Sequence, residues 1–307
     1  MTSRWPLPAV AESRVILQGD ALLGWRRRQL ALGGRAEDLD WLLDLVGGLR
    51  WADLQRLRLA PERGVPLQCA LSSLEALWRR HLESQEPLQY LAGCCPWRDL
   101  TLAVAPGVLI PRQDTELLVE LAEQLVDRPP AVWADLGTGS GCLAIALARL
   151  WPQSRGVAVD LSPVALRQAH ANVAAAGVAD RLVLAAGSWW QPLEPQWGQL
   201  ELVVANPPYI PTAVWSGLDP VVRDHEPALA LDGGSDGLQA LRAITAGAGA
   251  ALAPGGWLVL EHHHDQSSAV AALLAAAGLE QMQAHADLQG VRRFASARNP
   301  SSRHDCA

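Results

Sequence analysis

The sequence predicts a doubly wound α/β domain with a mostly parallel seven-stranded sheet, preceded by a small all-helical domain and a connecting β-hairpin. Three observations support this fold class. From residue 131 onward, short apolar runs alternate with helical patterns, as in the βαβ units that build a parallel sheet. Residues 10–83 instead carry helical periodicity alone. The segment between these two regions alternates apolar and polar residues, as a half-buried strand does.

Helical periodicity dominates the N-terminal domain, which we place at residues 1–86. Leu39, Leu42 and Leu43 recur at helical spacing, and Gly47-Gly48 then ends the segment as a C-cap would. Two further apolar stripes follow in the sequence up to residue 82. Because none of these segments contains a convincing strand, we expect this domain to be all-helical.

A β-hairpin is expected in the linker, residues 87–112. Residues 100–104 alternate apolar with polar or small side chains, which gives the period of two of a half-buried strand. Pro106-Gly107 supplies a turn. Residues 108–110 are apolar and predict the second strand. The hairpin would join the two domains.

Strands and helices alternate through the C-terminal domain, residues 113–298, and residues 299–307 form a polar tail that we expect to be flexible. An amphipathic helix opens this domain at Asp114 or Thr115 and runs to about residue 126. The expected strands are residues 131–135, 156–160, 181–185, 200–205, 257–261, 281–285 and 291–297. The expected helices between them are residues 141–150, 163–176, 237–252 and 267–277.

Charge and residue usage exclude several classes of function. The 307-residue chain has a net charge of −7, which opposes a broad electrostatic grip on nucleic acid. All 25 basic residues are Arg. Without lysine the chain has no Schiff-base amine, no attachment point for pyridoxal phosphate and no Walker-type phosphate lysine.

Cysteine usage favours a reducing compartment. The five cysteines are odd in number and show no C-x-x-C spacing, so they indicate neither a zinc site nor a disulfide framework. No apolar run reaches the length of a membrane span, and the N-terminus lacks a hydrophobic signal core. We therefore expect a cytoplasmic protein with no membrane partner.

A glycine-rich loop joins the first predicted parallel strand to its helix. It reads Asp135-Leu136-Gly137-Thr138-Gly139-Ser140-Gly141. Its glycines allow a sharp turn and a close approach of the backbone to a ligand at a helix N-terminus. The spacing is not that of a dinucleotide-binding fingerprint, and Asp135 disfavours a phosphate by like-charge repulsion. A ligand with a positive centre fits better, such as the sulfonium and ammonium groups of S-adenosylmethionine.

Two further strand ends carry residues that suit a nucleoside. Asp160 ends the second parallel strand about twenty residues past the glycines, where an acidic side chain can bond ribose hydroxyls. Its alternative role is to cap the helix that starts at Pro163, but Ser162 can fill that position. After the third strand come Ser188, Trp189 and Trp190, where either indole could stack on an adenine ring.

The fourth parallel strand ends at Asn206-Pro207-Pro208-Tyr209. The two prolines end both β-sheet pairing and any helix. They therefore hold the Asn206 amide and the Tyr209 ring rigidly at the carboxyl end of the strand. In a doubly wound sheet the first and fourth strands are neighbours at the switch point. This tetrapeptide and the glycine loop should then face one another across one crevice.

These motifs make the chain resemble the class I S-adenosylmethionine-dependent methyltransferases, with their Rossmann-like fold. More closely, it resembles the bacterial N5-glutamine methyltransferases that modify peptide chain release factors. The resemblance covers nearly the whole chain, including the helical N-terminal domain and the hairpin. Its marks are Glu86-Pro87-Leu88-Gln89-Tyr90, Leu109-Ile110-Pro111-Arg112-Gln113-Asp114-Thr115-Glu116, the glycine loop, Asn206-Pro207-Pro208-Tyr209-Ile210, Glu226-Pro227, Leu231-Asp232-Gly233-Gly234 and Asp287-Leu288-Gln289-Gly290.

The resemblance implies an enzyme that methylates the side-chain amide of a glutamine, the one in the release-factor GGQ motif. It implies that Asn206 contacts both cofactor and substrate, and that Asn206 and the Pro207 carbonyl bind the amide hydrogens while Tyr209 lies against the amide plane. The cofactor contacts it implies are Asp135, Gly137, Thr138, Gly139, Ser140, Gly141, Asp160, Ser188, Trp189 and Asn206. The substrate contacts it implies are Asn206, Pro207, Pro208 and Tyr209. Where the family often has an Asp before the tryptophan, this chain has Ser188.

Release factors are accordingly the expected partners, and we expect the N-terminal domain to bind them. No direct binding of nucleic acid is expected. Transfer would depend mainly on orientation and desolvation of the amide. The alternative is an adenine-N6 methyltransferase acting on DNA or RNA, since the Asn206 motif suits any planar NH₂ group, including a flipped base. A third hypothesis is a cofactor-binding scaffold without activity.

No metal is expected. The histidines of His262-His263-His264 are adjacent, and adjacent side chains on a strand cannot all face one site. They follow Glu261 at the end of the fifth strand and predict a surface turn between strand and helix.

Overall fold

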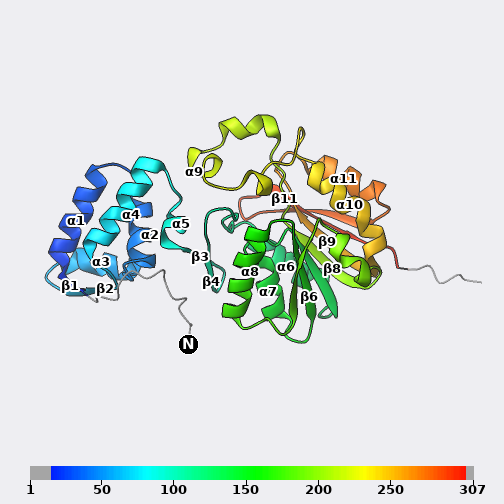
Figure 1. The fold of residues 1–307 in the computed structure, drawn as a ribbon, viewed down its shortest axis with the longest axis horizontal. Helices are drawn as coiled ribbons and strands as arrows, with labels where there is room; N and C mark the ends of the chain where they lie inside the picture. The colour runs from blue at the N-terminus through cyan, green and yellow to red at the C-terminus, as the bar shows by residue number, and fades with distance from the viewer. Residues whose placement is uncertain (1–14, 302–307) are drawn as a thin grey trace, which may run out of the picture. The chain divides into compact units, whose positions relative to one another are not determined.

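The computed structural model describes residues 15–301, which fall into two compact units. The first unit runs to Cys95 and also includes the later segment Pro220–His225. The second comprises Pro96–Asp219 and the chain from Glu226 on. In the ribbon of Figure 1 the first unit is mostly blue and cyan, and the second runs from green to red.

Five helices build most of the first unit. Leu39, Leu42 and Leu43 lie on one face of the second helix and are fully buried, as their spacing predicted. They pack in one core with Leu74 and Trp78 of the fourth helix. The helices are α1 (Gly19–Ala31), α2 (Ala36–Leu45), α3 (Trp51–Leu59), α4 (Leu71–Ser84) and α5 (Leu88–Ala92), and the short α9 (Pro220–Arg223) joins them from the later segment.

The expectation that this domain contains no strand is wrong. β1 (Val15–Gln18) pairs antiparallel with β2 (Gly64–Leu67) in a two-stranded sheet. Pro66 lies in β2 opposite Ile16, and proline is tolerated there because each strand of such a ribbon is an edge strand. The pair is short and joins segments far apart in the sequence, so no local pattern reveals it.

The connecting hairpin exists, but its strands differ from those predicted. β3 (Cys94–Trp97) pairs with β4 (Leu100–Ala103), and the turn between them holds Arg98 at φ 51°. Residues 108–110, predicted as the second strand, form no strand. The reason is that a usable partner precedes residue 100: Cys94, Cys95 and Trp97 supply the buried side chains that pair with the alternating segment.

The second unit contains the predicted seven-stranded sheet, in the order β10-β11-β9-β8-β5-β6-β7. β9, β8, β5, β6 and β7 run parallel. β11 pairs antiparallel with β9, and β10 pairs antiparallel with β11 at the edge of the sheet. This confirms the predicted fold class. The strands are β5 (Val132–Leu136), β6 (Arg155–Asp160), β7 (Leu182–Ala186), β8 (Leu200–Ala205), β9 (Leu252–Glu261), β10 (Glu280–Ala286) and β11 (Arg292–Arg298).

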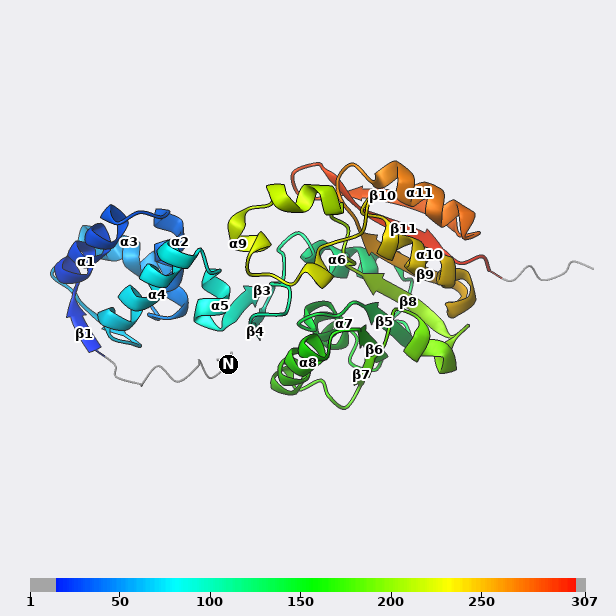
Figure 2. The same ribbon diagram turned by 45° about the horizontal axis from the view of Figure 1, so that its top comes forward.

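Helices cover both faces of this sheet because its strands are apolar on both sides. Trp133 and Leu202 point into one core, together with residues of α6 (Glu116–Leu125), α7 (Cys142–Leu150) and α8 (Pro163–Ala176). Their neighbours Ala134 and Val203 point into the opposite core, with residues of α10 (Gln239–Ala251) and α11 (Ser267–Ala276). Figures 1 and 2 show α7 and α8 on one side of the strands and α10 and α11 on the other.

The predicted ends of several elements are confirmed by local chemistry. Helix α8 begins at Pro163, and the Ser162 hydroxyl caps it by accepting the Ala165 N–H at 3.3 Å. The ordered chain passes the predicted boundary at residue 298, since Asn299 accepts from Gly255 N and donates to Leu252 O. Residues 302–307 of the predicted tail lie outside the described residues. Within residues 15–301 no helix has both the length and the apolar character to span a membrane.

The order of strands puts two motifs side by side. β5 and β8 are parallel neighbours, and Leu136 at the end of β5 pairs with Ala205 at the end of β8. The glycine loop and Asn206 therefore leave adjacent strands at the same edge of the sheet. This is the predicted switch point, where open α/β sheets bind ligands.

Candidate functional site

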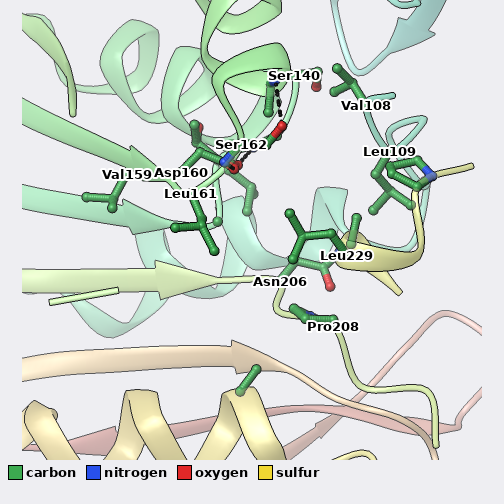
Figure 3. Close-up of a pocket in the computed structure, with 18 of the residues that line it drawn as sticks. Val108, Leu109, Ser140, Val159, Asp160, Leu161, Ser162, Asn206, Pro208 and Leu229 are labelled. Carbon is green, nitrogen blue, oxygen red and sulfur yellow. Dashed lines mark hydrogen bonds between the residues drawn. The ribbon is translucent and has the colours of Figure 1, made fainter. Parts of the chain in front are cut away.

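A pocket of about 550 Å³ opens at this edge of the sheet, in the second unit. Residues that follow four parallel strands line it: Gly137 after β5, Leu161 after β6, Gly187 after β7 and Asn206 after β8. Figure 3 shows Asp160, Asn206, Pro208 and Leu229 around the same space. The carboxyl ends of the parallel strands thus converge on one cavity.

The glycine loop forms the floor of the pocket. Gly137 N and Thr138 N both donate to Val159 O at 2.9 Å, so the loop turns over the end of the neighbouring strand. Gly137 has φ +78°, and a Cβ built on it would meet the Trp189 ring at 3.4 Å. That distance is an ordinary van der Waals contact, so it is the positive φ of the turn that favours glycine here. Gly139 and Ser140 also lie on the wall, whereas Gly141, the N-cap of α7, does not.

Asp160 lies on the pocket wall, as predicted for a ligand contact. One carboxylate oxygen accepts from Gly139 N and the other from Ser162 N, both at 2.8 Å. The dashed lines of Figure 3 show these bonds around Asp160. Burial raises the pKa of this carboxyl, and the backbone donors oppose that rise. Asp160 therefore holds the glycine loop in place while one edge of its carboxylate faces the cavity.

Asp135 lies beneath the loop rather than on the pocket wall. It is fully buried, and its Oδ2 accepts from the Thr138 hydroxyl at 2.7 Å. Its Oδ1 has no hydrogen-bond partner among the described residues. Burial raises the pKa of this carboxyl to about 7, and the nearby Asp160 adds to the rise. Asp135 therefore supports the glycine loop from below through its bond to Thr138.

The two candidate tryptophans have different surroundings. Trp189 lines the pocket next to Ser188 and adopts φ +45°. Trp190 is buried in the core, where its Nε1–H donates to Ile244 O at 3.0 Å. Of the two indoles, only Trp189 is placed to meet a ligand in this pocket.

The Asn206 motif divides between the pocket and its surroundings. Asn206 and Pro208 line the pocket, whereas Pro207 is buried and Tyr209 lies behind the wall. The Tyr209 hydroxyl donates to Glu261 Oε1 at 3.0 Å, and its backbone carbonyl accepts from Gln266. In residues 15–301, neither Asn206 Oδ1 nor the Pro207 carbonyl has a hydrogen-bond partner. Both acceptors named in the sequence prediction thus lack a partner within the described residues, but only Asn206 lies on the pocket wall, whereas Pro207 is buried.

A chain of hydrogen bonds runs from Asn206 through Thr115, which also lines the pocket, to a buried carboxylate. Its Nδ2 donates to Thr115 Oγ1 at 2.9 Å, and the Thr115 hydroxyl donates to Glu261 Oε2 at 2.7 Å. Glu261 is 2% exposed, and burial raises its pKa to about 7. The same carboxylate accepts from Tyr209, and burial of that phenol, together with the nearby Glu261, raises its pKa. One buried group thus connects both polar side chains of the Asn206 motif.

An ion pair between buried Glu226 and partly exposed Arg112 fixes one part of the pocket wall. The Glu226 side chain accepts from Arg112 Nη2 at 2.7 Å and from Ile110 N at 3.1 Å. Pro227 and Leu229, which follow it, line the pocket, as do Val108 and Leu109 ahead of Ile110. The pair therefore ties two wall segments that lie far apart in the sequence.

Sequence reasoning assigned no role to Thr115, Glu261, Arg112 or Glu226. Glu261 carried a usable signal, because a carboxylate that ends a buried parallel strand points to the ligand-binding edge of the sheet. Arg112, Thr115 and Glu226 belong to segments quoted for the family resemblance, yet their partners follow only from long-range contacts.

The adjacent histidines lie in the turn after β9, but the prediction that all of them are on the surface is wrong for His262. His262 is fully buried and its Nδ1 lies 2.7 Å from His263 O, while His263 Nδ1 lies 2.6 Å from Asp265. Across the described part of the chain, no group of three or more His, Cys, Asp or Glu side chains is arranged to hold a metal ion.

Comparisons with known proteins agree with this geometry. A family model described as ribosomal protein L11 methyltransferase (PrmA) matches residues 112–207. The catalytic domain of hMettl16, solved in complex with MAT2A 3'UTR hairpin 6, is similar at a TM-score of 0.53 and 13% identity, covering 74% of this chain and 80% of that one. At that identity the likeness shows the methyltransferase fold alone.

Curated relatives are much closer in sequence. The release factor glutamine methyltransferase of Prochlorococcus marinus is 49% identical over 284 residues, which cover 92% of this chain and 97% of that protein. That of Synechocystis sp. is 40% identical over 299 residues, with 93% and 98% covered. Identity of this degree over nearly the full length of both proteins confirms the family that the motifs suggested: the chain belongs to the release factor glutamine methyltransferases.

Proposed function

We propose that this protein transfers a methyl group from S-adenosylmethionine to the side-chain amide nitrogen of a glutamine in a peptide chain release factor. The observation that carries the proposal is the placement of Asn206. Its Oδ1 is an unused acceptor on the wall of a pocket whose floor is the glycine loop. Membership of the family supports the choice of a protein glutamine as substrate.

The residues present fit S-adenosylmethionine. The cavity of about 550 Å³ has the size of a small-molecule site. Asp160 on its wall suits ribose hydroxyls, and the Trp189 ring suits stacking on adenine beside Ser188. Gly137, Thr138, Gly139 and Ser140 would contact the cofactor along the loop. When bound, S-adenosylmethionine supplies a methyl group carried on a positively charged sulfur.

The chain contributes orientation to the amide. A glutamine NH₂ is a weak nucleophile because its lone pair is delocalised into the carbonyl. Asn206 Oδ1 and the Pro207 carbonyl can each accept one of its two hydrogens, which directs the nitrogen toward the cofactor pocket. Tyr209, fixed through its hydroxyl, would lie against the plane of the amide. Pro208 lines the pocket beside Asn206.

The first unit would bind the release factor away from the methyl-transfer site. It has its own core and none of the pocket-lining residues. A role in recognising the protein predicts that substitutions on its surface raise KM for the release factor and leave the cofactor affinity unchanged.

The decisive experiment compares methyl acceptors. Purified protein is incubated with methyl-labelled S-adenosylmethionine and, separately, with release factor, with release factor whose GGQ glutamine is replaced by Ala, and with DNA or RNA. We expect label in the unmodified release factor alone. Label in nucleic acid with none in the release factor would overturn the proposal in favour of adenine methylation.

A further inference from the structure

Three side chains link the substrate-side amide to a buried carboxylate. Asn206 Nδ2 donates to Thr115 Oγ1, and the Thr115 hydroxyl donates to Glu261 Oε2. We propose that Thr115 and Glu261 are positioning residues that fix which end of the Asn206 amide faces the substrate. The inference rests on the proposed function, because it concerns how the acceptor glutamine is held.

The direction of the Asn206 amide matters because its two ends have opposite chemistry. Oδ1 accepts hydrogen bonds and Nδ2 donates them, so a glutamine NH₂ can be held only by the oxygen. The two ends are nearly the same size, and packing alone discriminates weakly between them. A partner that accepts from the nitrogen end therefore has to fix the orientation, and Thr115, on the wall of the same pocket, is that partner.

The direction of the two hydrogen bonds distinguishes the nitrogen end of the Asn206 amide from its oxygen end. A carboxylate is an acceptor only, so Glu261 takes the single proton of the Thr115 hydroxyl. Thr115 Oγ1 then has only lone pairs left to offer to Asn206. It therefore binds the NH₂ end and leaves Oδ1 toward the pocket. The carboxylate acts on Asn206 through one intervening hydroxyl.

The same carboxylate positions the second substrate-side residue. Glu261 Oε1 accepts from the Tyr209 hydroxyl at 3.0 Å, while Oε2 accepts from Thr115. Thr115 is 3% exposed and Glu261 2% exposed, so water does not replace these partners. Residues from the start of α6, the end of β8 and the end of β9 are thereby held to one group.

The arrangement depends on the charge of Glu261. The groups that face it are Tyr209 after β8, Asp114 and Thr115 ahead of α6, and Arg293 on β11. Burial raises its pKa to about 7, Asp114 adds to the rise, and Arg293 and the two hydroxyl donors oppose it. A protonated Glu261 must donate through one oxygen. When it donates to Thr115, that hydroxyl turns its proton toward Asn206 and favours the opposite amide orientation.

The test removes the hydroxyl without changing the shape of the side chain. Thr115→Val should lower kcat for release-factor methylation by roughly 10- to 100-fold and leave the Kd for S-adenosylmethionine near the wild-type value. Thr115→Ser restores the hydroxyl and should recover most of kcat. Thr245→Val is the matched control, because it removes a buried hydroxyl that bonds only helix carbonyls and should leave kcat unchanged.

The pH profile distinguishes orientation from general structural support. Wild-type kcat should fall on the acid side as Glu261 takes up a proton, with a midpoint near the pKa of about 7. Thr115→Val should show a low kcat without that limb, because the link to Glu261 is broken. Glu261→Gln, which has no titrating group, should lose the limb as well.

Two results would overturn the inference while leaving methyl transfer intact: wild-type kcat in Thr115→Val, or an unchanged acid limb in that variant. Equal losses in Thr115→Val and Thr115→Ser would also contradict it, because they would show a packing role. A wild-type protein that labels no release factor would instead refute the proposed function, and the inference with it.

Discussion

Asn206 Nδ2 and Thr115 Oγ1 lie 2.9 Å apart although 91 residues separate them in the sequence. The bond fixes the nitrogen end of an asparagine that lies on the wall of the pocket, and its oxygen end has no partner among the described residues. Site geometry here thus comes from a contact across the sheet, between the start of α6 and the end of β8.

Replacing Asn206 by Ala should abolish methyl transfer and spare cofactor binding. The substitution removes the Oδ1 acceptor, so the glutamine amide loses its orientation and turnover should fall by about 100-fold or more. The Gly137–Ser140 floor and Trp189 remain. Calorimetric titration with S-adenosylmethionine should give a Kd within a modest factor of wild type. Near-normal turnover in Asn206→Ala would remove this residue from the mechanism.

Asp160→Asn should weaken binding of the cofactor. An amide NH₂ would replace one of the two oxygens that now accept from Gly139 N and Ser162 N, so one backbone donor would meet another donor. We expect the affinity for S-adenosylmethionine to drop roughly tenfold or more. Asp180→Asn, a substitution at an exposed carboxylate, is the matched control. Equal affinity in both variants would contradict the role of Asp160.

The adjacent tryptophans should separate binding from stability. Trp189→Ala removes a ring from the pocket wall and should lower cofactor affinity roughly tenfold, as the loss of a stacked aromatic does. Trp190→Ala empties part of the core and should lower the free energy of unfolding by about 3–5 kcal/mol. Binding and thermal unfolding measured on both variants check the division. A loss of stability in Trp189→Ala as large as in Trp190→Ala would refute it.

Buried Asp135 should make stability fall as pH rises. Its pKa is raised from 3.8 to about 7 in the folded protein, so between these values the folded state binds a proton that the unfolded chain has released. The free energy of unfolding attributable to this group therefore decreases as pH increases through that window. Because Asp135→Asn carries no titrating group at this position, its free energy of unfolding should not decrease in this way.

The measurement is the difference in melting temperature between Asp135→Asn and wild type at pH 5 and at pH 8. We expect Asp135→Asn to gain relative to wild type at the higher pH. Asp180→Asn, at an exposed position, should show no such trend. A constant difference between Asp135→Asn and wild type across pH would mean that Asp135 titrates near its ordinary value.

The sequence predicts the sheet well where local signals are strong. β8 has the predicted bounds because an apolar run stops at Asn206 and two prolines, and α8 does because Ser162 and Pro163 mark its start. β9 begins at Leu252, five residues before the prediction, because its pairing with β8 continues across the Pro254–Gly256 turn with a shift in register.

Elements that depend on distant partners were missed. β1 and β2 are four residues each and pair across an interval that holds three helices. The hydrogen bond from Thr115 to Glu261 spans 146 residues, so no window of sequence contains it. Trp189 and Trp190 have identical chemistry, and only the packing of Trp190 against α10 decides which ring reaches the pocket.

The first unit includes Pro220–His225, so the chain passes between the units after Cys95, after Asp219 and after His225. Within that unit, His225 Nε2 lies 2.8 Å from Ser84 O at the end of α4. A truncation that removes the N-terminal residues would strip this segment of its packing partners, so the unit is not a detachable module.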